Sequence, residues 1–480
     1  MTEKTYNKGL VWVIAAIAAT GGLLFGFDTG VISGAIPYFQ KAFALEDSWI
    51  EIITTAGLVG AVVGAMFCGR LTDILGRKKV ILGSAVIFII GAVWSGAAPS
   101  AGNLVVARLF LGLAIGISSF SVPLYIAEIS PTKIRGTLVS MFQLLITIGI
   151  MVSYFSDLAF AKPEGVVGYE SCWRPMFYVG VIPALIMFIG MIFLPETPRW
   201  LISKGHEDKC REVLQKVEEP QLVEVVISKM KEEIAADAAN TNHWSDVFKP
   251  WLKPALIIAV GIMFVQQFTG INTIIYYSPK IFLMAGFEGA KAAIMASVSV
   301  GVINVIFTIL SLFMIDKLGR RKLFFIGLSG MVLSLLALGA CFAFQTTLGD
   351  SIKGLTIALV LIYIAFFAIS LGPLGWLIIS EVFPLKVRGI GASIGSLSNW
   401  LFNGVVAFTF FKIVKGLTMA GSELTVNGEN LGNPAGAFWL YALVGIAGLI
   451  WGYFYIPETK GKTLEQIEDH WRQGKLPKEL

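Results

Sequence analysis

The sequence is poor in charge: Asp, Glu, Lys and Arg make up 14% of its 480 residues, whereas 56% are hydrophobic. So little polar surface excludes a water-soluble globular domain and indicates a protein of the bilayer. The four cysteines show no CxxC spacing and there are only three histidines, so neither a disulfide framework nor a metal site is indicated. The net charge of +5 lies in short Lys and Arg clusters at the ends of apolar segments, and we expect no nucleic-acid partner.

Twelve apolar stretches are long enough, at about 20 residues, to cross a bilayer as helices. They cover residues 10–34, 50–69, 80–98, 104–127, 138–160, 175–194, 254–283, 292–315, 323–345, 355–380, 390–414 and 435–456. The loops after the second, fourth, eighth and tenth stretches carry Arg and Lys clusters. The positive-inside rule therefore predicts that these loops and both chain termini are cytoplasmic.

A polar segment separates the sixth and seventh stretches. Its apolar residues recur near helical spacing, which predicts short amphipathic helices on the cytoplasmic side. We therefore predict an all-α membrane protein with a six-helix bundle at 1–200, a helical linker at 201–250, a second six-helix bundle at 251–460 and a cytoplasmic tail at 461–480.

The charged loops of the first half return in the second half. The run GRLTDILGRKK at 69–79 returns as DKLGRRK at 316–322, AEISPTKIRG at 127–136 returns as SEVFPLKVRG at 380–389, and PET at 195–197 returns at 457–459. Two related bundles in one chain favour a transporter with its site between them.

Further motifs make the chain resemble the sugar porters of the major facilitator superfamily from end to end. They are PETPRW at 195–200, QQFTGIN at 266–272, GPLGW at 372–376 and PETKG at 457–461. The run at 69–79 is shared by the wider superfamily, whereas QQxxGIN together with the two PET motifs is specific to the sugar porters. The resemblance implies twelve helices in two pseudo-symmetric bundles and the transport of a monosaccharide, with the bilayer around a functional monomer.

Amides within the apolar stretches are the candidate sugar ligands, since a neutral amide both donates and accepts hydrogen bonds. They are Gln143, Gln266, Gln267, Asn272, Asn304 and Asn399. Taken alone, such amides are also consistent with hydrogen bonds that hold helices together. The resemblance assigns them to the sugar, places Trp376 against its apolar face, and adds Tyr276 and Phe25 as an aromatic wall. It also implies that Gly372 and Pro373 break the tenth span so that Trp376 can move.

Asp28 is the candidate proton carrier. It lies well inside the first span, where an ionisable residue costs about 2.5–3.5 kcal/mol and is a functional candidate by default. Arg108 on the fourth span is expected at a similar depth, and its counterpart in the second half is Leu361, so the pair exists in one half only. Burial favours the neutral acid and pairing with Arg108 favours the ionised form, so a change in the pairing alters proton affinity. The alternative is a purely structural ion pair.

Proton-coupled sugar porters carry an acid at the position of Asp28, so the resemblance implies proton symport. Asp157, near the outer end of the fifth span, is a weaker candidate that we expect to face water.

Charged residues gather at the predicted cytoplasmic ends of both halves. They are Arg77, Glu128, Arg135, Glu196, Arg199, Arg320, Glu381, Arg388 and Glu458. An exposed pair contributes only about 0–1 kcal/mol. The resemblance implies that together they form a cytoplasmic gate that closes the inner side while the site faces outward.

Three other functions compete with symport. A passive sugar uniporter would share the fold, and a sugar sensor would need a longer cytoplasmic tail. An enzyme is disfavoured because no GxSxG, HExxH or P-loop pattern is present, and no cofactor is indicated.

Ile150 stands where some pentose sites have an amide, so we expect a hexose such as glucose, with a pentose as the alternative.

Overall fold

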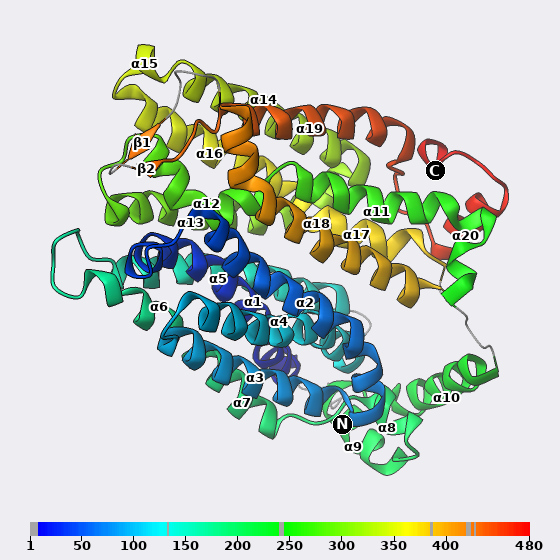
Figure 1. Cartoon of the computed structure of the whole chain (residues 1–480). Helices are drawn as coiled ribbons and strands as arrows, with labels where there is room; N and C mark the ends of the chain where they lie inside the picture. Colours follow the sequence, from blue (N-terminus) through cyan, green and yellow to red (C-terminus); the bar gives the residue numbers. More distant parts are fainter. Residues whose placement is uncertain (1–7, 132–133, 240–243, 385–386, 419–423, 427–428) are drawn as a thin grey trace. The chain divides into compact units, whose positions relative to one another are not determined.

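The computed structural model describes residues 8–131, 134–239, 244–384, 387–418, 424–426 and 429–480. Twelve candidate spans lie among them, which confirms the predicted all-α membrane architecture. They are α1 (Lys8–Ala42), α2 (Asp47–Leu75), α3 (Arg77–Ala97), α4 (Ala101–Ile129), α5 (Arg135–Phe160), α6 (Trp173–Val179) with α7 (Val181–Phe193), α11 (Lys253–Phe268) with α12 (Ile271–Met284), α13 (Ala290–Leu318), α14 (Arg320–Ala343), α16 (Ser351–Ile369) with α17 (Leu371–Val382), α18 (Arg388–Leu417) and α19 (Ala435–Tyr455) (Figure 1).

Short elements occupy the polar segments. Between the sixth and seventh spans lie α8 (Pro198–Ser203), α9 (Glu207–Val217) and α10 (Val223–Ala239). On α9, Val213, Leu214 and Val217 are buried, as expected for an amphipathic helix. Other short elements are α15 (Gln345–Leu348), α20 (Leu464–Arg472), the antiparallel strands β1 (Thr425–Val426) and β2 (Glu429–Asn430), and four 3-10 helices at Tyr169–Ser171, Trp244–Phe248, Pro250–Leu252 and Pro477–Glu479.

Contacts divide the chain into two compact units. The first comprises Met1–Asp28, Val59–Gly149 and Phe177–His243, and the second comprises Thr29–Leu58, Ile150–Met176 and Trp244–Leu480. In the first unit α3 packs along α4 and α7, and in the second α14 packs along both α16 and α19 (Figure 1). The second unit therefore includes the ends of α1, α2 and α5 that lie away from the basic loops. We call these the outer ends, following the positive-inside prediction.

Glycine allows the closest helix packing in the first unit. A Cβ added to Gly26 on α1 would lie 1.9 Å from the carbonyl oxygen of Ile146 on α5, and one added to Gly149 would lie 2.2 Å from the carbonyl oxygen of Leu23. Only residues without a side chain fit where two helix backbones touch, which explains glycine at these two positions.

Candidate functional site

The seventh span is broken within the QQFTGIN run. Helix α11 ends at Phe268 and α12 begins at Ile271, with Gly270 between them at φ 87°. A Cβ at Gly270 would also come within 2.5 Å of the Tyr441 ring, so glycine is required on two counts. The carbonyl oxygen of Thr269, at the break, accepts a hydrogen bond of 2.8 Å from the Tyr363 hydroxyl. Irregular backbone at membrane depth is thus supplied with partners by a neighbouring helix.

The tenth span is broken as well, and Gln266 joins the two breaks. Helix α16 ends at Ile369 and α17 begins at Leu371, directly before the Gly-Pro pair that was expected to interrupt this span. The Nε2 atom of Gln266 donates to the carbonyl oxygens of Leu371 at 2.6 Å and Gly372 at 3.3 Å. One buried amide therefore holds both broken spans.

Four of the predicted sugar ligands form a continuous network around Gln266. Its Oε1 atom accepts from Gln267 Nε2 at 3.2 Å and from Asn399 Nδ2 at 2.7 Å. Gln267 Oε1 in turn accepts from Asn272 Nδ2 at 2.6 Å. Three of these side chains are buried, and Asn272 is partly exposed. The network presents neutral donors and acceptors at the breaks, where regular helix is interrupted.

Aromatic residues and a further amide lie on the same helices. Trp376 on α17 is 37% exposed, so part of its indole is not covered by the protein. Tyr276 is buried, and its hydroxyl accepts from Asn403 Nδ2 at 3.2 Å. Asn403 was missed by the sequence analysis, although it lies one helical turn after Asn399. Its Oδ1 atom is buried without a partner among the described residues, so it is available to a ligand hydroxyl.

The remaining predicted sugar contacts are Asn304, Gln143 and Phe25. Asn304 is buried on α13, and no hydrogen bond among the described residues links it to Gln266 or Gln267. Gln143 on α5 and Phe25 on α1 are partly buried and belong to the first unit.

Asp28 and Arg108 form a buried ion pair within the first unit. Arg108 Nη1 donates to Asp28 Oδ1, and the two side chains are 4% and 5% exposed. The guanidinium also lies 5.8 Å from the centre of the Phe177 ring. The geometry brings together the two residues that we expected to meet, in a dry environment where removing either charge would leave the other uncompensated.

Asp157 corrects one expectation. It was expected to face water, but its exposed fraction is 0%. The carboxyl group lies between α5 and α1, against Gly34, where the absence of a Cβ leaves room for it. Its position near the end of the span therefore led to the wrong expectation that the side chain is exposed.

The charged residues of the first half form one cluster around the start of α3. Arg77 Nη2 donates to Glu128 Oε1 at 3.0 Å, and the Thr197 hydroxyl donates to Glu128 Oε2 at 2.6 Å. Glu196 accepts from the backbone N–H groups of Arg77 and Lys78 at 3.1 and 3.2 Å, which caps the helix. Burial raises the pKa of the Glu196 carboxyl, and these hydrogen bonds oppose the rise.

The second half repeats this arrangement with the equivalent residues. Arg320 Nη2 donates to Glu381 Oε1 at 2.8 Å, and the Thr459 hydroxyl donates to Glu381 as well. Glu458 accepts from the backbone N–H groups of Arg320 and Arg321 at 2.9 and 3.1 Å at the start of α14. The repeated loops of the sequence are thus repeated helix caps and ion pairs.

The other predicted gate residues are Arg135, Arg199 and Arg388. Arg135 Nη2 donates to the Ser130 carbonyl oxygen at 3.3 Å, Arg199 lies on α8, and Arg388 lies near Glu381 at the start of α18. Each cluster holds its own half together, and the predicted latch function of the gate stays a prediction.

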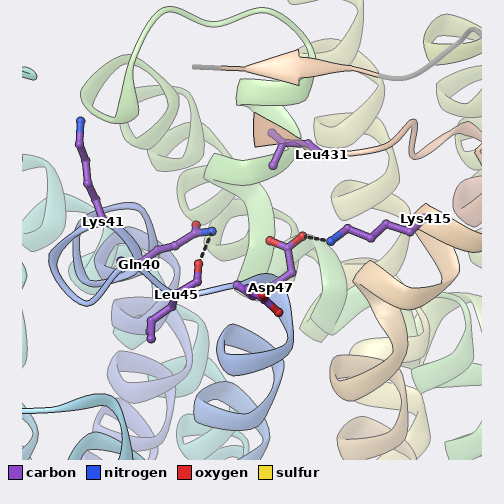
Figure 2. A pocket seen from close by; sticks show the side chains of 8 residues that line it. Gln40, Lys41, Leu45, Asp47, Lys415 and Leu431 are labelled. Carbon is purple, nitrogen blue, oxygen red and sulfur yellow. Dashed lines mark hydrogen bonds and ion pairs between the residues drawn. The ribbon is translucent and has the colours of Figure 1, made fainter. Parts of the chain in front are cut away.

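The outer ends of the second unit carry ion pairs that the sequence analysis missed. Asp47 Oδ2 lies 2.7 Å from Lys415 Nζ, and Asp47 Oδ1 lies 3.7 Å from Lys280 Nζ. Glu51 Oε2 lies 2.8 Å from Lys412 Nζ. Figure 2 shows the Asp47–Lys415 pair at a pocket of about 530 Å³ that is also lined by Gln40. These contacts join α2 to α12 and α18.

Among the described residues, no cluster of His, Cys, Asp or Glu could hold a metal ion. Two broken spans, a buried amide network beside them and a buried Asp–Arg pair define a membrane transporter of polar, uncharged molecules.

Comparisons with known proteins identify the family. The model described as "Sugar (and other) transporter" matches residues 14–471. The glucose transporter GlcP of Staphylococcus epidermidis is 37% identical over 468 residues, covering 97% of this chain and 98% of GlcP. The galactose-proton symporter of Escherichia coli is 35% identical over 477 residues, covering 99% and 97%. The proton:xylose symporter XylE, solved with bound 6-bromo-6-deoxy-D-glucose, is similar at 30% identity and a TM-score of 0.79, with 97% and 100% covered.

The chain therefore belongs to the sugar porter family of the major facilitator superfamily. This is a family of transporters, and the chain is an integral membrane transporter rather than an enzyme.

Proposed function

We propose that the protein imports a monosaccharide together with a proton across the inner membrane of a bacterium, by alternating access between two six-helix bundles. The basic loops and both termini lie in the cytoplasm, and the monomer is the working unit. A hexose such as glucose is the preferred substrate, because Ile150 is apolar where a further amide would suit a pentose.

The observation that carries the proposal is the amide network of Gln266, Gln267, Asn272 and Asn399 at the two broken spans. A sugar hydroxyl both donates and accepts, as these amides do, whereas charged residues would be required for an ionic substrate. Trp376 is partly exposed, and its ring would pack against the apolar C–H face of a pyranose. The relatives named for glucose, galactose and xylose support the same substrate class.

Proton coupling is carried by the Asp28–Arg108 pair. When Asp28 binds a proton its charge is lost and Arg108 is released, so proton binding and the packing of α1 against α4 are linked. The membrane potential supplies about 2.3 kcal/mol per charge per 100 mV, which for one proton per sugar corresponds to a roughly fifty-fold sugar gradient. The name of the galactose-proton symporter supports this mode of transport.

The test is sugar uptake in proteoliposomes, with a panel of labelled glucose, galactose, xylose and arabinose. We expect alkalinisation outside during uptake, accumulation driven by a proton gradient, and the highest rate for a hexose. Asp28→Asn mimics the protonated acid and should abolish accumulation while sugar counterflow persists.

Uptake without proton movement would instead identify a uniporter. Counterflow lost together with accumulation in Asp28→Asn would mean that the ion pair is structural, and binding without any transport would favour a sensor.

A further inference from the structure

One buried carboxyl group has no role in the proposed mechanism. Asp157 lies on α5 near its outer end at Phe160, its exposed fraction is 0%, and neither carboxyl oxygen has a hydrogen-bond partner among the residues that the structure describes. A Cβ added to Gly34 on α1 would come within 2.3 Å of Asp157 Oδ2, so α1 covers the carboxyl group directly. A polar group buried without a partner calls for an explanation.

The surroundings of Asp157 favour its neutral form. The titratable side chains that face it are the phenols of Tyr38 on α1 and Tyr154 on α5. Both hydroxyls donate to backbone carbonyls, so they do not stabilise a carboxylate. Lys280, the cation on α12, is paired with Asp47 instead. The Gly34 backbone N–H is the one donor that faces the carboxyl group, and no cation pairs with Asp157 among the described residues. Since an ionised carboxylate in such a place is strongly disfavoured, the neutral acid is favoured while Asp157 is enclosed.

The helices that enclose Asp157 also contact α12 near their outer ends. The Tyr154 hydroxyl donates to the Ile275 carbonyl oxygen on α12 at 2.8 Å, and Ser33 Oγ on α1 lies 3.3 Å from Ser278 Oγ on α12. Asp157 is one helical turn beyond Tyr154 on the same side of α5. Under the proposed alternating access, opening the outer side separates α12 from α1 and α5, and water then reaches this turn.

We propose that Asp157 is a second proton-binding site, which senses the pH of the outer medium. It takes up a proton when the outer ends of α1, α5 and α12 close, and returns it to the same side when they open. Asp28 carries the transported proton, whereas Asp157 makes closure of the outer side dependent on pH. The inference rests on the proposed function only through alternating access, since closure is the event that the proton favours.

The experiment measures outer opening with a single thiol. Ser278→Cys is introduced where the four native cysteines are replaced by serine, because Ser278 is 1% exposed and is uncovered only when α12 separates from α1. Labelling by a membrane-impermeant thiol reagent is followed against pH in sodium-free buffer. Since thiols themselves react faster at higher pH, the quantity compared is the rate relative to the same reporter in Asp157→Asn.

We expect this relative rate to rise with pH by up to about tenfold per pH unit, which is the limit for one proton. Asp350→Asn is the matched control, because its side chain is 98% exposed, and it should behave as the wild type. A relative rate that stays constant with pH would overturn the proposal. A rise that appears only when sodium is added would also overturn it, because the carboxylate would then bind a sodium ion and not a proton.

Infrared spectroscopy keeps the proposal testable if the reporter disturbs the fold. In the protein that keeps Ser278, the infrared spectrum should contain the carbonyl stretching band of a protonated carboxylic acid. Asp157→Asn should remove this band, and an unchanged band would overturn the assignment. In proteoliposomes Asp157→Asn should retain proton-driven accumulation, whereas Asp28→Asn should lose it. Failure of the Asp28 result refutes proton symport and leaves the Asp157 result standing, so the two are distinguishable.

Discussion

Replacement of Glu51 by glutamine is expected to weaken closure of the outer side. The Glu51 side chain is 1% exposed, and it accepts hydrogen bonds from Lys412 Nζ at 2.8 Å and from the Phe411 backbone N–H at 3.0 Å. Glutamine has nearly the same shape and retains one acceptor, but it lacks the charge and turns an N–H₂ group toward the ammonium.

The magnitude follows from the kind of hydrogen bond that is lost. Bonds to a charged group contribute about 1.5–3 kcal/mol and neutral ones about 0.5–1.5 kcal/mol. Because the Lys412 side chain is 51% exposed, water compensates part of the loss on its side of the pair. We therefore expect the closed conformation to lose about 1–3 kcal/mol, which shifts the ratio of outer-open to outer-closed molecules by about 5–150-fold.

The assay is the labelling rate of the Ser278→Cys reporter at one pH. Glu46→Gln is the matched control: it makes the same change of charge at the same end of the molecule, but Glu46 is exposed and has no ion pair among the described residues. Glu51→Gln should label faster, and Glu46→Gln should label as the parent does. Equal rates in both variants, with sugar binding intact, would refute the reasoning.

Three further predictions concern the sugar site, the gate and the linker. Gln267→Ala and Trp376→Ala should each weaken sugar binding about two- to tenfold, since each removes a neutral contact worth about 0.5–1.5 kcal/mol, while insertion stays normal; calorimetric titration checks this. Glu381→Ala should favour opening of the inner side by about 1–2 kcal/mol, because it breaks a charged hydrogen bond; thiol accessibility from the cytoplasmic side checks this. The hydrogen bond from Lys231 lowers the pKa of Glu207 from its usual 4.5, so this contact between α9 and α10 should persist at neutral pH and be lost only as pH falls below 4.5; hydrogen exchange of α9 against pH checks this.

Much of the fold could be predicted because hydrophobic length is a local property. A stretch of about 20 apolar residues crosses a bilayer as an α-helix, so the twelve stretches predicted the twelve spans. The repeated loops predicted that equivalent charged residues lie at the starts of equivalent helices. The pairing of Asp28 with Arg108 followed from depth alone, since two buried charges at one depth have few other partners.

The features that the sequence did not predict mostly depend on contacts between residues far apart in the chain. Asp157 could not be placed from its position near a helix end, because its burial results from Gly34 on another span. The ion pair of Glu51 with Lys412 joins residues separated by most of the chain, and neither lies in a repeated motif. Asn403 could have been found from its spacing after Asn399, since residues four apart share one face of a helix.

Under the proposed function, a sugar that binds at Gln266 competes for a hydrogen bond that the protein already uses. The same amide group donates to the Leu371 and Gly372 carbonyl oxygens at the break of the tenth span. A substrate hydroxyl that accepts from Gln266 must displace these carbonyls, and they then require water or the substrate itself as a new donor. Sugar binding would thus act on α17 directly, because the Gln266 amide would exchange its hydrogen bonds with the α17 backbone for hydrogen bonds with the sugar.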